Sequence, residues 1–272
     1  MKKSKKSLSV PKVYIKGRKP SFLDWNSQIL LSSLRKIDMS IISIVILDIL
    51  FYFFSYYIFI FWLQRIQDKM ATFNLPADIA ILGFERTQQL VSEARIFLYI
   101  IIFSFILVLL AIIFIASIIN SVIWAKVTNT KITFVLVSKF LGLNLIWMSF
   151  WFVLIFLISW LVQPASAPLF MITAIILGFY FTNTLYTIFM EKQKLRNIID
   201  AVKLNITKIH LFLLPYAIIF LLFYIIFRIN NIITFNYSSF FFGLVLVTYA
   251  ALVRYYISNL VVEIEKIKPK SF

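Results

Sequence analysis

Six long apolar stretches constrain the fold of this chain more than any other feature. They cover residues 39–63, 96–123, 141–162, 168–190, 210–228 and 239–260. A helix needs about 20 apolar residues to cross the hydrocarbon of a bilayer. Because lipid offers no hydrogen bonds, a spanning backbone must bond within itself, which makes helices the default. The sequence therefore predicts an all-α, polytopic integral membrane bundle of six transmembrane helices.

The composition excludes a large soluble domain. Hydrophobic residues make up 62% of the chain and charged residues only 14%, against the usual quarter for a soluble protein. A soluble domain of this length needs more polar surface than that to cover its core. We therefore expect one membrane domain at 21–260, between a basic, disordered cytoplasmic tail at 1–20 and a cytoplasmic C-terminal tail at 261–272.

The distribution of basic residues predicts the orientation. With both termini placed in the cytoplasm, the outer segments contain only Arg65, Lys69, Arg86, Arg95 and Arg228. The rest of the 27 Lys and Arg residues then lie on the inner side, as the positive-inside rule requires. The expected location is the cell membrane, with six spans and both termini inside.

The segment 191–209 is charged but carries one apolar stripe when it is placed on a helix. The stripe contains Leu195, Ile198, Ile199, Val202, Ile206 and Ile209. Such a helix can lie in the membrane interface, or it can pack beneath the helical bundle. In the first case Lys192, Arg196 and Lys203 contact anionic lipids of the inner leaflet. The simpler alternative is a basic loop that only sets topology.

Two other segments share this character, namely 22–39 before the first span and 131–142 before the third. Each of the three precedes an outward-going span that is followed by a returning one. Lys139 and Lys203 occupy equivalent places under an offset of 64 residues. The pattern predicts three hairpin repeats, each preceded by a cytoplasmic amphipathic helix. Any six-span protein with basic inner loops partly imitates such a repeat, so a non-repeated bundle is the alternative.

The stretch from Asn183 through "TLYTIFMEKQKLRNIIDAVKLNITKIHLFLLPYAIIF" resembles a broad group of polytopic membrane proteins. It is similar to the membrane domain found beside some glycerophosphodiester phosphodiesterases, and the likeness covers about 110–220. Its motif is an apolar helix end, a charged turn and then "AVKLN". The catalysis of that group resides in a separate soluble barrel without a counterpart in this sequence. The resemblance implies a membrane context only and assigns no site residue.

A few polar residues within the spans are candidates for an intramembrane site. Asp48 is the only acidic residue inside a predicted span, where a carboxylate is costly and suggests proton or cation handling. Arg254 can reach it across the bundle, or can extend to the inner interface instead. Asn120, Asn144 and Asn183 lie near inner helix ends and are candidates for a polar vestibule. The alternative for all of them is hydrogen bonding between helices.

The sequence contains no catalytic or metal-binding motif. It has no cysteine and one histidine, His210, and its five glycines form no phosphate loop. We expect no enzyme activity, no cofactor, no metal and no nucleic-acid partner. The bilayer, its anionic lipids and a membrane protein are the expected partners. We expect a non-enzymatic protein that organises a membrane complex or the inner-leaflet surface. The alternative is a small permease, or a transporter subunit, that uses an intramembrane carboxylate.

Overall fold

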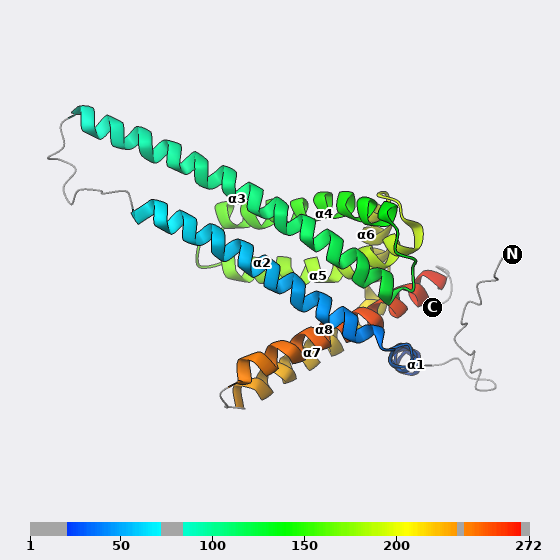
Figure 1. Ribbon diagram of the computed structural model, residues 1–272. Coiled ribbons are helices and arrows are strands. Elements are labelled where there is room, and N and C mark those ends of the chain that lie inside the picture. The colour runs from blue at the N-terminus through cyan, green and yellow to red at the C-terminus, as the bar shows by residue number, and fades with distance from the viewer. Residues whose placement is uncertain (1–20, 72–83, 233–236, 268–272) are drawn as a thin grey trace. The chain divides into compact units, whose positions relative to one another are not determined.

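The computed structural model describes residues 21–71, 84–232 and 237–267, and these residues form helices and no strand (Figure 1). The helices are α1 (Phe22–Arg35), α2 (Ser40–Ala71), α3 (Phe84–Val127), α4 (Phe134–Leu161), α5 (Ala167–Lys192), α6 (Asn197–Thr207), α7 (Ile209–Ile232) and α8 (Ser238–Lys266). Within this part of the chain, α2, α3, α4, α5, α7 and α8 are long and apolar enough to cross a membrane. The prediction of an all-α membrane protein with six spans is confirmed.

Two compact units make up the chain. Unit 1 contains residues 1–45, 124–130 and 168–272, and unit 2 contains residues 46–123 and 131–167. Unit 1 therefore holds α1, the start of α2, the end of α3, and α5 to α8. Unit 2 holds most of α2 and α3, together with α4.

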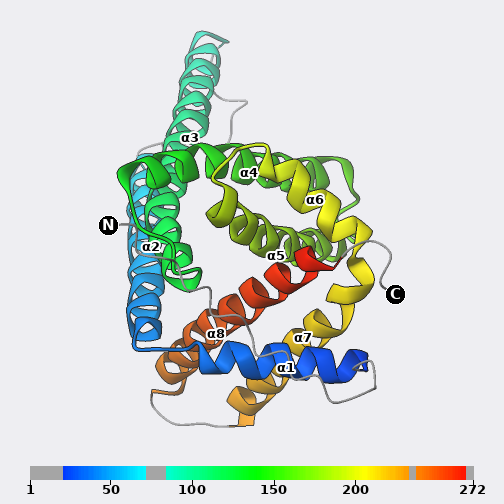
Figure 2. The ribbon, with the colours of Figure 1, turned by 90° about the vertical axis from the view of Figure 1, so that its right-hand side faces the viewer.

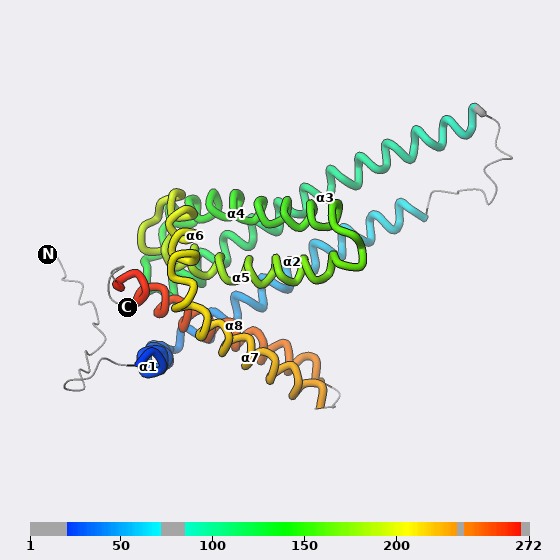
Figure 3. Tube along the Cα trace, turned by 180° about the vertical axis from the view of Figure 1, so that it is seen from behind, coloured from blue at the N-terminus to red at the C-terminus, as the bar shows by residue number. Residues whose placement is uncertain are grey.

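Within unit 1, α7 and α8 lie side by side (Figure 3). The short helix α1 runs across this pair and packs on α8 (Figure 2). Ser21 caps its N-terminus: the Ser21 hydroxyl accepts a hydrogen bond from the backbone N–H of Asp24, while the Asp24 carboxylate accepts one from the N–H of Ser21. This reciprocal pair satisfies two of the N–H groups that a helix start leaves without partners. The start of α1 is therefore specified locally.

Unit 2 is joined by a few polar contacts between apolar helices. Trp62 on α2 donates a 2.9 Å hydrogen bond from Nε1 to Ser104 Oγ on α3. Only 6% of the most apolar window of α3 is buried within the protein. Most apolar side chains of α3 are therefore available to lipid, which is the arrangement expected when the solvent is a bilayer rather than water.

The long helices extend past the predicted spans. Helix α3 has 44 residues and rises about 66 Å at 1.5 Å per residue, about twice the thickness of the hydrocarbon. Its first turns, which contain Arg86 and Arg95, precede the predicted span 96–123. From the sequence a helix start is also expected near Asp78, since Asp is a favoured N-cap residue, but this position lies outside the described residues.

The segment 131–142 does not form a separate helix. Thr133 caps α4 by accepting a hydrogen bond from the N–H of Leu136 at 3.2 Å, and residues from Phe134 onward are the first turns of α4. A separate short helix before a span is therefore found at α1 and at α6. The three-fold hairpin repeat stays a prediction.

Candidate functional site at the helix ends of unit 1

The candidate site lies where α1 and α6 meet the C-terminal turns of α5 and α8. We call this region, formed by residues 22–36, 183–192, 197–207 and 255–266, the junction. Side chains at its boundaries are exposed and charged. Its buried interior contains asparagine, serine and threonine side chains. The hydrogen bonds inside the junction show how the two short helices are held.

Helix α1 is fixed to α8 through Asn259. The Asn259 amide donates from Nδ2 to Ser33 Oγ at 2.8 Å, and its Oδ1 accepts from Lys36 Nζ at 2.5 Å. Just beyond α1, the hydroxyls of Ser40 and Tyr255 lie 2.6 Å apart. One asparagine therefore bonds two positions at the end of α1.

The contact between α1 and α8 involves a titratable group, since Lys36 bonds to Asn259. Partial burial lowers the pKa of Lys36, and the nearby Glu263 carboxylate partly opposes that effect. Asp38 follows in the loop, where its Oδ1 accepts a hydrogen bond from the Ser40 hydroxyl and a 2.9 Å bond from the Ser40 N–H. These bonds hold the pKa of Asp38 below its usual range. The carboxylate form of Asp38 therefore stabilises the start of α2.

The charged stretch 191–209 contains a shorter helix than the sequence predicts. Helix α5 continues to Lys192, and Gln193 then takes a left-handed backbone conformation with φ of 52°. Because a residue with positive φ cannot continue a right-handed helix, α6 begins only at Asn197. It ends at Thr207, and α7 begins at Ile209.

Polar and small side chains of α6 face the protein. The buried residues are Asn197, Ala201 and Asn205, at a spacing of four. Asn205 accepts a 2.8 Å hydrogen bond at Oδ1 from Thr184 Oγ1 on α5, and its backbone carbonyl accepts one from the Tyr180 hydroxyl at 2.9 Å. The sequence shows an apolar stripe on this helix but gives no sign that the opposite, polar side faces the protein.

Two aliphatic side chains of the same helix point away from the protein, whereas Ile198, Val202 and Leu204 are half-buried. Ile199 is 65% exposed and Ile206 is 61% exposed. Lys203 is exposed as well, and so is Arg196 just before the helix. The exposed surface of α6 therefore combines isoleucines with basic groups, while its buried surface carries hydrogen-bonded amides.

An ion pair joins the ends of α5 and α8. Lys192 Nζ lies 2.9 Å from Glu265 Oε1, and both side chains are partly exposed. Exposed pairs of this kind contribute little to stability, typically about 0–1 kcal/mol. Of the three residues that the sequence predicts to contact anionic lipid, Lys192 therefore has a partner within the protein.

Asp48 and Arg254 belong to different units. Asp48 lies on α2 in unit 2 and is only 3% exposed, whereas Arg254 lies half-buried on α8 in unit 1. The predicted pairing between them stays a prediction. The burial of Asp48 is a separate observation, since a carboxyl group within an apolar helix is costly wherever it lies.

The predicted vestibule residues take part in local and interhelical bonds. In unit 2, the buried Asn144 amide donates a 3.0 Å bond from Nδ2 to Ser117 Oγ on α3, and Asn120 is half-buried. In unit 1, Asn183 donates from Nδ2 to the Phe179 carbonyl one turn earlier in α5. The described geometry is that of interhelical and intrahelical hydrogen bonding, and a shared vestibule stays a prediction.

Among the described residues, no group of three or more His, Cys, Asp or Glu side chains is arranged to hold a metal ion. The junction offers hydrogen bonding by amides and hydroxyls, together with the charges of its basic and acidic groups.

Comparison of the chain with protein-family models, with curated proteins and with solved structures finds no match. The resemblance to the phosphodiesterase-associated membrane domain stays a prediction. What can be concluded about function rests on the geometry of the two units.

Several residues of the junction were not singled out from the sequence. They are Asn26, Ser33, Asn197, Asn205 and Asn259. The sequence does contain one signal of their position. Asn26 and Ser33 are seven residues apart, which is the spacing of two positions on the same face of a helix. Polar pairs with helical spacing inside otherwise apolar short helices indicate the side that faces the protein.

Proposed function

We propose that the chain is a non-enzymatic, polytopic membrane protein whose junction organises the inner-leaflet surface or a membrane complex. The observation that carries this proposal is the orientation of α6. A helix that buries amides and leaves isoleucines exposed beside basic groups suits the membrane interface, where its aliphatic side enters the acyl boundary. The same surface is also suited to an apolar partner helix.

The basic residues support the lipid part of this proposal. In the orientation that the positive-inside rule predicts, Lys192, Arg196 and Lys203 lie at the cytoplasmic leaflet. Each basic residue close to an anionic surface contributes roughly 1 kcal/mol of attraction. Together with the exposed isoleucines, they provide both an apolar and an electrostatic contribution to binding.

Purification in a mild detergent, followed by native mass spectrometry, tests both parts. A stoichiometric protein partner supports the role in a complex, and retained phosphatidylglycerol supports the role at the lipid surface. Changing Lys192, Arg196 and Lys203 together to Gln is expected to reduce the retained partner or lipid. The matched control changes Arg65, Arg95 and Arg228, which are predicted to lie on the outer side, to Gln.

An equal loss in both triple variants contradicts the proposal, because net charge alone then explains the binding. A protein that retains neither a partner nor anionic lipid also contradicts it.

The burial of Asp48 supports a second candidate, a permease that handles protons or cations through this carboxyl group. Transport would require Asp48 to change its protonation or its ligand during each cycle. Asp48→Asn is therefore expected to abolish a proton- or cation-dependent flux in reconstituted vesicles while the thermal stability is kept. A normal flux in that variant excludes this role for Asp48.

A further inference from the structure

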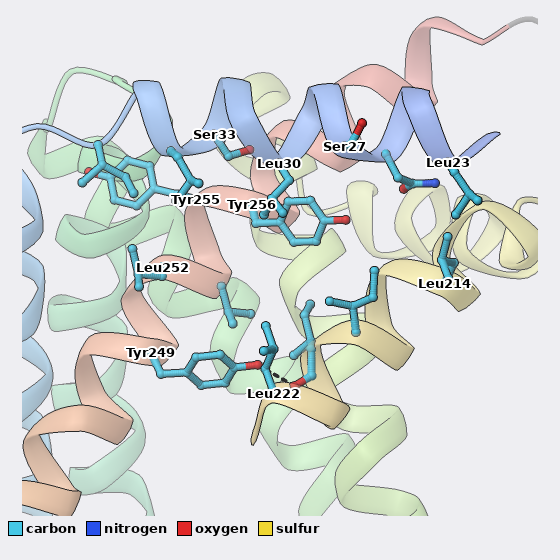
Figure 4. Close-up of a pocket in the computed structure, with 16 residues that line it drawn as sticks. Leu23, Ser27, Leu30, Ser33, Leu214, Leu222, Tyr249, Leu252, Tyr255 and Tyr256 are labelled. Carbon is cyan, nitrogen blue, oxygen red and sulfur yellow. Dashed lines mark hydrogen bonds between the residues drawn. The ribbon is translucent and has the colours of Figure 1, made fainter. Parts of the chain in front are cut away.

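A cavity of about 460 Å³ lies between α1, α7 and α8, all within unit 1 (Figure 4). Figure 4 shows residues of α1 along one side, with Leu222 and Tyr249 at the far end from α1. Its size is within the roughly 300–1,000 Å³ range of sites that hold small ligands. The cavity therefore runs from α1 toward the interior of the α7–α8 pair.

The walls of the cavity are almost entirely apolar. Leu30 and Leu34 from α1, Ile218 and Leu222 from α7, and Leu252 from α8 contribute aliphatic surface. None of the lining residues carries a charge. Because an ion placed in such surroundings loses its hydration without compensation, an occupant with a charged group inside the cavity is excluded on energetic grounds.

One lining group departs from this pattern. Asn26 is 4% exposed, and its Nδ2 donates a 2.9 Å bond to the Phe22 carbonyl, which fixes the orientation of the amide. Its Oδ1 is buried and accepts no hydrogen bond within the part of the chain that the structure describes. A buried acceptor left without a donor costs about 1–3 kcal/mol.

Three other polar side chains of the lining differ from Asn26, because each donates a hydrogen bond within the protein. Ser27 and Ser33 donate to carbonyls of α1, and Tyr249 donates to the Ile219 carbonyl. The Tyr256 ring lies just below α1 in Figure 4 and brings a hydroxyl to the same side of the cavity. The polar end of the cavity is thus the end at α1.

We propose that this cavity binds the alkyl chain of a neutral lipid whose uncharged hydroxyl head donates a hydrogen bond to Asn26 Oδ1. The head then lies at the level of α1, and the chain extends toward Leu222 and Tyr249. A bilayer supplies such amphiphiles at its interface, where the sequence pattern of 22–39 predicts that α1 lies. This site is separate from the basic residues of α6 and does not depend on the function proposed for them.

Two probes that differ in a single donor test the proposal. Oleyl alcohol carries the hydroxyl, and oleyl methyl ether has the same chain without a donor. Native mass spectrometry of the full-length protein in detergent measures the bound fraction of each. The unchanged protein is expected to bind the alcohol about tenfold more tightly than the ether, the ratio that 1.4 kcal/mol produces.

Two variants locate the binding. Asn26→Leu removes the acceptor and is expected to bring the alcohol-to-ether ratio close to one. Ile218→Trp fills the cavity and is expected to weaken both probes about tenfold or more. The ratio is measured on the folded protein, so a general loss of stability does not imitate the effect of Asn26→Leu.

Three results overturn the proposal. Equal binding of both probes by the unchanged protein means that water, not a lipid head, satisfies Asn26. Failure of both probes to bind means that the cavity is empty or is covered by another segment of protein. A preference for the alcohol that survives in Asn26→Leu places the hydroxyl elsewhere.

Discussion

Thr184 donates a 2.8 Å hydrogen bond from Oγ1 to Oδ1 of Asn205 and so joins α5 to α6. Both residues are fully buried, and the bond holds the polar side of α6 against the protein. Thr184→Val keeps the shape of the side chain and removes the donor. We expect the free energy of unfolding to fall by about 1–2 kcal/mol, because the buried Asn205 Oδ1 then loses the hydrogen bond that Thr184 donates. Unfolding in mixed micelles measures this.

A double-mutant cycle separates this bond from packing. Replacing both partners, in Thr184→Val with Asn205→Leu, is expected to restore part of the loss, since no acceptor then remains. Thr173→Val is the matched control, because Thr173 is exposed and bonds only within α5. A loss in the control as large as in Thr184→Val contradicts the role of the bond.

The contact of α1 with α8 gives a second prediction. Asn259→Leu removes the acceptor of Lys36 and the donor to Ser33. We expect backbone amides of α1 to exchange with deuterium about five- to tenfold faster, since a loss of about 1–1.4 kcal/mol in local stability has that effect. Hydrogen-exchange mass spectrometry of peptides covering 22–35 measures this.

Ser32→Ala provides the comparison for that experiment. Ser32 also lies on α1, but its hydroxyl bonds to the Ile29 carbonyl of the same helix. Exchange in α1 should stay close to that of the unchanged protein in this variant. If Asn259→Leu behaves in the same way, α1 is held by its apolar contacts alone.

A third prediction concerns pH. Hydrogen bonds from Ser40 lower the pKa of Asp38 in the folded protein, so the carboxylate stabilises the fold above the unfolded pKa of about 3.9. This contribution disappears as the pH falls through the lower, folded pKa. The difference in melting temperature between the unchanged protein and Asp38→Ala should therefore be largest near pH 6 and shrink toward pH 3. A difference that stays constant over this range excludes a contribution from the charge.

The spans could be predicted from the sequence because apolar length alone determines them. Each predicted span falls within an observed long helix except for single residues at Met39 and Val162, since lipid allows few other backbone structures. The helix ends were harder to predict. Helices α2 and α3 continue into polar residues, where hydropathy gives no signal but the backbone still bonds to itself. Hydropathy therefore indicates what crosses the membrane, not where a helix stops.

The junction could not be predicted in the same way. The apolar stripe of α6 is visible in the sequence, but periodicity does not tell whether protein or lipid covers it. In water the apolar side of a helix faces the core, whereas beside a bilayer both lipid and protein can accept it. The structure shows Asn197 and Asn205 facing inward and Ile199 facing outward. Contacts of α6 with α5 and α7, which are remote in sequence pattern from the stripe itself, determine that choice.

The orientation of the chain gives the last prediction. Because the sequence contains no cysteine, single cysteines can be placed without further change. Ser166, between α4 and α5, and Lys194, between α5 and α6, are both exposed and lie at opposite ends of α5. The distribution of basic residues predicts Ser166 outside and Lys194 inside. In intact cells, a membrane-impermeant maleimide should label Ser166→Cys at once and Lys194→Cys only after permeabilisation. The cysteine-free chain is the background, and equal labelling of both variants after denaturation confirms equal reactivity. The reverse pattern would place Lys192, Arg196 and Lys203 at the outer leaflet and would remove the basis for their contact with anionic lipids of the inner one.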